Sequence, residues 1–159
     1  MPGSGKTTLG KLLSEKMRYR FIDTDSLIED KEQLAISLIF KEKGEMYFRE
    51  KEKEVVEELK NVTGAVIATG GGMPAFFDNL SRLKEMGIII YLRVPLEEIE
   101  KRTEAKDDRP LLTKNRRKAL EEIINFRKCY YEKADIIIDN YMRSKEDVCE
   151  LIVSEIRDL

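Results

Sequence analysis

The chain opens with Met1-Pro2-Gly3-Ser4-Gly5-Lys6-Thr7-Thr8, which matches the second half of the phosphate-binding loop motif G-x-x-x-x-G-K-[ST]. A glycine-rich turn of this kind lets successive backbone N–H groups point at phosphate oxygens without Cβ clashes. An amphipathic helix predicted over about residues 7–17 follows directly, and its N-terminus adds the positive end of the helix dipole. The pattern predicts a nucleoside triphosphate site rather than a flexible tail.

Each residue type in this loop suits that chemistry. We expect Lys6 to reach the outer phosphates as a point charge and Thr7 to offer its hydroxyl to Mg²⁺. The residues expected to bind the nucleotide here are Gly3, Ser4, Gly5, Lys6, Thr7 and Thr8.

Composition narrows the chemistry further. The 159 residues fit one domain, and a net charge of −2 with mixed signs throughout indicates no nucleic-acid partner. The chain contains no histidine, which excludes Ser-His-Asp and Cys-His nucleophiles and histidine-ligated metals. Carboxylates, lysine, arginine and a hard cation remain, and that set suits phosphoryl transfer.

Two further features concern the compartment. No apolar run approaches transmembrane length, so we expect no membrane association. Cys129 and Cys149 form neither a disulfide framework nor a metal-binding spacing, and they are typical of reduced thiols in a cytoplasmic protein.

Strands and helices are predicted to alternate along the chain. The predicted strands are 19–23, 65–69, 88–92 and 135–139. The predicted helices are 7–17, 25–31, 35–43, 46–60, 76–86, one beginning near Pro95, one ending near 133 and one at the C-terminus. This order predicts a three-layer α/β/α fold with a parallel sheet, which binds ligands beyond the carboxyl ends of its strands. The acids Asp23 and Asp25 and the glycines 70–72 both follow predicted strands.

The strand that normally enters a phosphate-binding loop, and the first glycine of the motif, would both precede Met1. That strand usually lies inside the sheet, and its loss leaves the N–H and C=O groups of two neighbouring strands unpaired. We therefore expect the natural protein to begin several residues upstream, with an apolar strand. The alternative is a genuine short form.

Six ordered segments together resemble one family. They are G-S-G-K-T-T (3–8), F-I-D-T-D (21–25), G-E-M-Y-F-R-E-K-E (44–52), A-T-G-G-G (68–72), R-P-L-L (109–112) and R-K-C-Y-Y-E-K-A-D (127–135). In order and spacing they resemble shikimate kinase over nearly the whole chain. The resemblance implies a single domain over 1–159 with a five-stranded parallel sheet, the first strand seemingly missing here. It also implies a helical substrate-binding region at about 25–60 and a mobile lid at about 104–116.

The same resemblance implies the reaction and its catalytic residues. The family transfers the γ-phosphate of ATP to the 3-hydroxyl of shikimate, with Mg²⁺. Lys6, Asp25 and Arg109 are the implied catalytic residues, with Asp25 as the proton acceptor and Arg109 on the lid. Thr7 is implied to ligate Mg²⁺, with Asp23 in its outer shell.

Substrate binding is implied for Asp25, Arg49, Gly71, Gly72 and Arg127, the two arginines gripping the carboxylate. Taken alone, Arg49 would be a solvated residue on a charged helix, although Glu52 is placed to orient it at i,i+3. Arg127 falls on an apolar helical stripe formed by Leu120, Ile124, Arg127, Tyr131 and Ala134. A guanidinium on such a stripe either pairs with a buried acid or faces a ligand anion.

Nucleotide binding is further implied for Arg102, Arg109 and Arg143. Arg102 matches a residue that lies against the adenine ring, and Arg143 falls in the loop that lines the adenine pocket. Both are otherwise ordinary surface arginines.

Two alternatives remain open on the sequence. The first is another small-molecule kinase with the same loop, such as gluconate kinase, with a nucleoside monophosphate kinase less favoured. The second is a non-catalytic, kinase-like binding module. The resemblance also implies a monomer.

Overall fold

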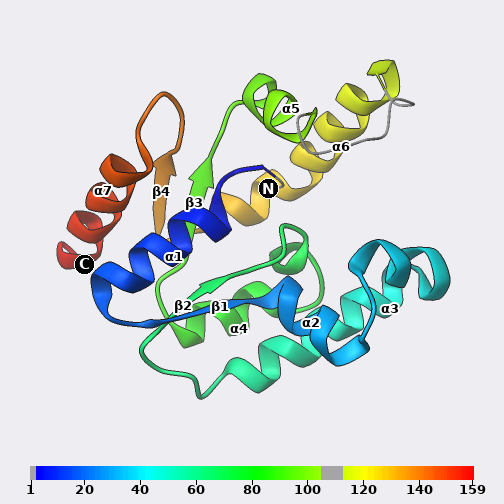
Figure 1. Cartoon of the computed structure of the whole chain (residues 1–159), viewed down its shortest axis with the longest axis horizontal. Helices are drawn as coiled ribbons and strands as arrows, with labels where there is room; N and C mark the ends of the chain where they lie inside the picture. Colours follow the sequence, from blue (N-terminus) through cyan, green and yellow to red (C-terminus); the bar gives the residue numbers. More distant parts are fainter. Residues whose placement is uncertain (1–2, 105–112) are drawn as a thin grey trace.

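The computed structural model describes residues 3–104 and 113–159, with the backbone alone for 103–104 and 113–116. Within these residues four strands alternate with seven α-helices (Figure 1). The strands are β1 (Arg20–Asp23), β2 (Ala65–Ala68), β3 (Ile90–Arg93) and β4 (Ile136–Asp139). The helices are α1 (Lys6–Met17), α2 (Thr24–Glu32), α3 (Ile36–Leu59), α4 (Asn79–Met86), α5 (Leu96–Glu104), α6 (Thr113–Tyr131) and α7 (Lys145–Arg157), with a 3₁₀ turn, η1, at Met73–Ala75.

The strands form two parallel pairs rather than one continuous sheet. β1 pairs with β2, with Asp23 opposite Ala68, and β3 pairs with β4, with Arg93 opposite Asp139. The two pairs are not hydrogen-bonded to each other. The predicted parallel arrangement is confirmed, and the separation follows from the absence of a further strand among the described residues that could lie between the pairs.

Helix α1 bridges the two pairs. It packs against β1 and β2 on one side and against α7 on the other, as Figure 1 shows for the blue helix between the two halves. A Cβ on Gly10 would lie 2.6 Å from the Phe21 ring, so a glycine is needed where α1 crosses β1. The largest buried cluster joins α1, β3, β4 and α7 through Leu9, Leu13, Leu92, Ile136, Ile138, Val148, Cys149 and Ile152.

A second buried cluster joins α2 and α3 and packs against β1 and β2. It consists of Ile28, Ile39, Phe48, Val55 and Leu59. The predicted break between two helices near residue 45 is present as a kink inside α3 at Gly44, whose φ of 84° and ψ of 169° are non-helical. None of the described helices has both the length and the apolar character needed to cross a membrane.

One helix starts later than predicted. The prediction placed a helix at 76–86, whereas α4 begins at Asn79. The preceding residues form η1 around Pro74, and Phe77 takes a left-handed conformation with φ of 52°. The chain therefore turns twice after the three glycines before the helix begins.

Candidate active site

The phosphate-binding loop leads directly into α1. Gly3 and Gly5 have φ values of 67° and 88°, which belong to the left-handed region that glycine adopts without strain. Gly5 is the N-cap residue of α1, and the first turn of the helix contains no acidic side chain. The positive end of the helix dipole is therefore not offset by a neighbouring carboxylate of that turn, which suits an anionic ligand.

Two side chains far along the chain hold this loop. The buried amide of Asn140, directly after β4, donates from Nδ2 to the Ser4 carbonyl at 2.7 Å. Arg102 donates from Nη1 to the Gly3 carbonyl at 3.3 Å and pairs with Glu98 through Nε at 2.8 Å. Arg102, for which the sequence predicts a position against the adenine ring, thus contacts the phosphate-binding loop. Asn140 was missed, and its position just after a strand is the only sequence signal for it.

Thr7 and Asp23 lie together at the start of α1 and the end of β1. The Thr7 hydroxyl donates to Asp23 Oδ2 at 2.9 Å, while Asp23 Oδ1 accepts the Asp25 N–H at 3.1 Å and caps α2. Hydroxyl and carboxylate oxygens are donors that Mg²⁺ prefers. The described residues contain no group of three or more metal-binding side chains, and Mg²⁺ held mainly by phosphates and water needs none.

Asp25 and Lys6 influence each other electrostatically. Burial raises the pKa of Asp25, the nearby Asp23 charge raises it further, and Lys6 opposes both. Burial lowers the pKa of Lys6, with attraction from Asp25 opposing. Asp25 Oδ1 is buried without a hydrogen-bond partner among the described residues, whereas buried polar atoms normally have one.

Arg49 is buried and is held on several sides, which excludes the alternative of a solvated surface residue. Its Nη1 donates to Glu52 Oε2 at 2.7 Å, which confirms the predicted i,i+3 pair. Its Nε and Nη2 donate to Glu45 Oε1 at 3.1 and 2.7 Å. The guanidinium also lies 4.2 Å from the centre of the Phe76 ring. Glu45 and Phe76 were not predicted.

Arg127 on α6 comes into the same neighbourhood. Its charge acts on Lys6 and Glu52, which places all three around one site. The Arg127 Nε is buried and has no hydrogen-bond partner among the described residues. Arg127 is therefore not paired through this atom with a buried acid among the described residues, and its contact with a ligand anion stays a prediction.

The three glycines after β2 form a loop that touches these side chains. A Cβ on Gly70 would lie 2.6 Å from Asp25 Oδ1, and a Cβ on Gly72 would lie 2.4 Å from Arg49 Nη1. Only glycine permits such close approach of the backbone to both groups.

Most backbone groups of this loop are already bonded. The Gly70 N–H donates to the buried Thr24 hydroxyl at 3.0 Å, and its carbonyl accepts from Met73 at 3.1 Å. The Gly72 carbonyl accepts from Ala75 at 2.9 Å, and the Gly71 carbonyl accepts from the Tyr131 hydroxyl at 2.6 Å. Within the described part of the chain, the N–H groups of Gly71 and Gly72 have no partner, which leaves them for a ligand.

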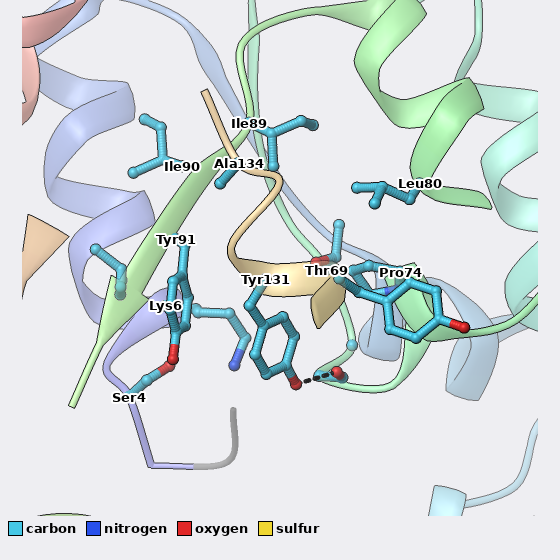
Figure 2. A pocket seen from close by; sticks show the side chains of 14 residues that line it. Ser4, Lys6, Thr69, Pro74, Leu80, Ile89, Ile90, Tyr91, Tyr131 and Ala134 are labelled. Carbon is cyan, nitrogen blue, oxygen red and sulfur yellow. Dashed lines mark hydrogen bonds between the residues drawn. The ribbon is translucent and has the colours of Figure 1, made fainter. Parts of the chain in front are cut away.

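Figure 2 shows the pocket beside this loop. Lys6 and Tyr131 point toward the same space, and the Tyr131 hydroxyl reaches the loop after β2. Tyr91 of β3 also lines this pocket. The pocket thus joins the phosphate-binding loop to the glycine loop.

Of the remaining predicted residues, one lies outside the described residues and the other is not brought into this group. Arg109 and residues 105–112 of the predicted lid lie outside the described residues. Arg143 is exposed between β4 and α7, where it interacts electrostatically with Asp139.

Comparison with known proteins identifies one family. The family model described as shikimate kinase matches residues 2–157. A shikimate kinase from Clostridium botulinum (strain Okra / Type B1) is 51% identical over 142 residues, covering 88% of this chain and 84% of that protein. A shikimate kinase from Persephonella marina is 44% identical over 155 residues, covering 98% and 94%.

Solved structures agree with this. The shikimate kinase from Acinetobacter baumannii in complex with shikimate superimposes with a TM-score of 0.91 at 35% identity, covering 99% of this chain and 89% of that one. The shikimate kinase from Aquifex aeolicus vf5 gives a TM-score of 0.82 at 33% identity, covering 98% and 91%.

Proposed function

Since the chain belongs to the shikimate kinase family, we propose how its described residues divide the work of that reaction. The enzyme transfers the γ-phosphate of ATP to the 3-hydroxyl of shikimate, giving shikimate 3-phosphate and ADP for aromatic amino acid biosynthesis. Gluconate kinase and a non-catalytic binding module are not favoured, because the family model covers nearly the whole chain.

A set of unsatisfied polar groups carries the proposed substrate site. Asp25 Oδ1, Glu52 Oε1 and Arg127 Nε are buried without partners among the described residues. The N–H groups of Gly71 and Gly72 also lack partners there, in a loop whose Gly70 and Gly72 lie against Asp25, Glu52 and Arg49. Buried polar groups are normally hydrogen-bonded. Two carboxylate acceptors together with a guanidinium and two N–H donors complement a ligand with hydroxyl groups and a carboxylate.

In this arrangement Arg49 and Arg127 bind the shikimate carboxylate, and Gly71 and Gly72 donate backbone N–H groups to the substrate. The planar guanidinium fork suits a carboxylate. Asp25 binds the substrate hydroxyls and accepts the proton of the attacking one. Its raised pKa makes it a stronger base than an ordinary aspartate.

The nucleotide side of the site is proposed to use residues 3–8, with Lys6 on the β- and γ-phosphates. Thr7 would ligate Mg²⁺ with Asp23 in its outer shell, and the 2.9 Å contact between the two side chains supports this assignment. When bound, Mg²⁺ offsets the negative charge of the phosphates. Arg102 and Arg143 are proposed at the adenine, and Arg109 on a lid that excludes water from the transfer.

We also propose that residues 1–159 form one kinase domain, monomeric and cytoplasmic, with a substrate-binding region at about 25–60 and a lid at about 104–116. The position of Asp25 on α2, and of Arg49 and Glu52 on α3, supports the first of these regions.

The proposed function is tested by ADP release from Mg-ATP with shikimate, with gluconate and with neither. We expect turnover that depends on shikimate and does not respond to gluconate. Omission of Mg²⁺ is expected to abolish it. Turnover with gluconate in place of shikimate would contradict the assignment.

A further inference from the structure

Tyr131 makes a contact that the reaction described above does not use. Its hydroxyl donates to the Gly71 carbonyl at 2.6 Å and so connects the end of α6 to the loop after β2 (Figure 2). The side chain is 8% exposed, and its ring stacks on Tyr91 of β3 with the ring centres 5.0 Å apart and the planes at 24°. Both partners therefore define the position of the hydroxyl.

The carbonyl that Tyr131 holds belongs to the same peptide unit as the Gly72 N–H. A trans peptide is planar, so its N–H points away from its C=O, and fixing one sets the direction of the other. The neighbouring peptide is fixed in a similar way, because Met73 donates to the Gly70 carbonyl and thereby sets the Gly71 N–H. Glycine has the most backbone freedom of any residue, so this loop needs such restraints to keep its donors aimed.

Tyr131 also relates this loop to the second carboxylate-binding arginine. Arg127 lies one helical turn earlier on α6 and interacts electrostatically with Tyr131. A single side chain thus ties the helix that carries Arg127 to the loop that carries the Gly72 N–H. Gly72 follows β2 of one strand pair, whereas α6 leads into β4 of the other, and the two pairs are not hydrogen-bonded to each other.

We infer that Tyr131 is a positioning residue of the shikimate site: through the Gly71 carbonyl it aims the Gly72 N–H at the substrate and holds α6 against the glycine loop. The inference rests on the proposed assignment of Gly72 and Arg127 to shikimate binding.

The test is Tyr131→Phe, which keeps the ring stack and the buried volume and removes only the hydroxyl. We expect the KM and the calorimetric Kd for shikimate to rise about 5- to 10-fold, the size of one lost hydrogen bond. The KM for ATP is expected to stay close to that of the unchanged enzyme, whereas the Tm is expected to fall modestly, because the Gly71 carbonyl loses its hydrogen bond. A purely structural role would lower the Tm and either leave the shikimate KM unchanged or raise both KM values alike, and that result would overturn the inference.

Two controls separate the possible failures. Tyr19→Phe removes the hydroxyl of an exposed tyrosine that does not line the pocket, and it is expected to leave both KM values unchanged. Arg127→Ala tests the underlying assignment through the shikimate KM. If Arg127→Ala raises that KM and Tyr131→Phe does not, the inference about Tyr131 is wrong. If neither raises it, the proposed substrate site itself is wrong.

Discussion

Asp25 is expected to lower the stability of the folded protein at neutral pH. Its pKa is raised by burial and by the charge of Asp23, so the folded protein holds this proton to higher pH than the unfolded chain does. The stabilisation from the protonated form is therefore complete at low pH and is lost as the pH rises through the folded-state pKa. At neutral pH the ionised side chain costs free energy of folding.

Asp25→Asn is accordingly expected to raise the Tm at pH 7 while lowering kcat by at least about 100-fold, because the proton acceptor is removed. Scanning calorimetry and ADP release measure the two effects. Asp30→Asn changes an exposed carboxylate of the same helix and is expected to alter neither. A drop in Tm for Asp25→Asn would contradict the argument from burial.

The pH dependence of the reaction follows from the same residue. We expect kcat/KM to fall on the acid side with a midpoint above 3.8, the ordinary aspartate pKa, because the protonated carboxyl cannot accept the substrate proton. The residual activity of Asp25→Asn should lack this limb. If the limb persists unchanged in the variant, another group is the proton acceptor.

Arg49 is a second residue whose geometry matters beyond its charge. It donates to both Glu45 and Glu52 and lies over the Phe76 ring, which a single ammonium cannot reproduce. Arg49→Lys is expected to raise the shikimate KM at least about 10-fold, the loss of a bidentate contact. It should also lower the Tm, because the buried Glu52 loses its partner.

Steady-state kinetics with each substrate varied in turn measure this effect. The matched control is Arg82→Lys, an exposed arginine that also pairs with two carboxylates, those of Asp78 and Glu57. We expect little change there, since exposed ion pairs contribute little. An equal change in the ATP KM for Arg49→Lys would argue against a role confined to shikimate.

At the scale of elements, the site is assembled from segment ends. α1 supplies Lys6 and Thr7 from its first turn, and α2 supplies Asp25 from its own first turn. The end of β4 contributes through Asn140, which holds the Ser4 carbonyl. The phosphate-binding loop is therefore fixed to the second strand pair as well as to its own helix.

Asn140→Ala is expected to raise the KM for ATP several-fold, because Ser4 and Gly5 lose the restraint that holds the loop, and to change the KM for shikimate much less. An effect of about 5-fold corresponds to one hydrogen bond. Asn125→Ala, on an exposed position of α6, serves as the control. If the shikimate KM rose as much as the ATP KM, the effect would be on the whole site rather than on the loop.

At the scale of the molecule, the site spans two strand pairs that share no backbone hydrogen bond. Arg49 and the glycine loop lie with β1 and β2, whereas Arg127 and Tyr131 belong to the helix that leads into β4. A ligand that binds groups from both strand pairs therefore connects them, and its binding free energy adds to the free energy of unfolding.

We expect shikimate at about 100 times its Kd to stabilise the protein by about 2.7 kcal/mol, measured as a shift in Tm. Arg127→Ala should lose most of that shift at the same shikimate concentration. Gluconate is the comparison ligand and should give a much smaller shift. Equal shifts with both compounds would contradict specific recognition.

The amino-acid sequence by itself was sufficient for features that are local. The phosphate-binding loop, the strand–helix alternation and the placement of Asp25 after a strand all follow from short spacings, because hydrogen bonding and burial impose fixed periods on helices and strands. Arg127 was recognisable for the same reason, as a cation on an apolar stripe. The identity of the substrate came instead from the resemblance of six ordered segments to one family, because residue spacing alone does not indicate a substrate.

Only the tertiary structure decided which distant groups meet. Tyr131 and Gly71 are 60 residues apart, and Asn140 and Ser4 are 136 apart. In both pairs a side chain donates to a backbone carbonyl, and every residue has such a carbonyl, so no residue type marks the acceptor. The partner is determined by how the strands and helices pack, and that packing is a property of the whole chain.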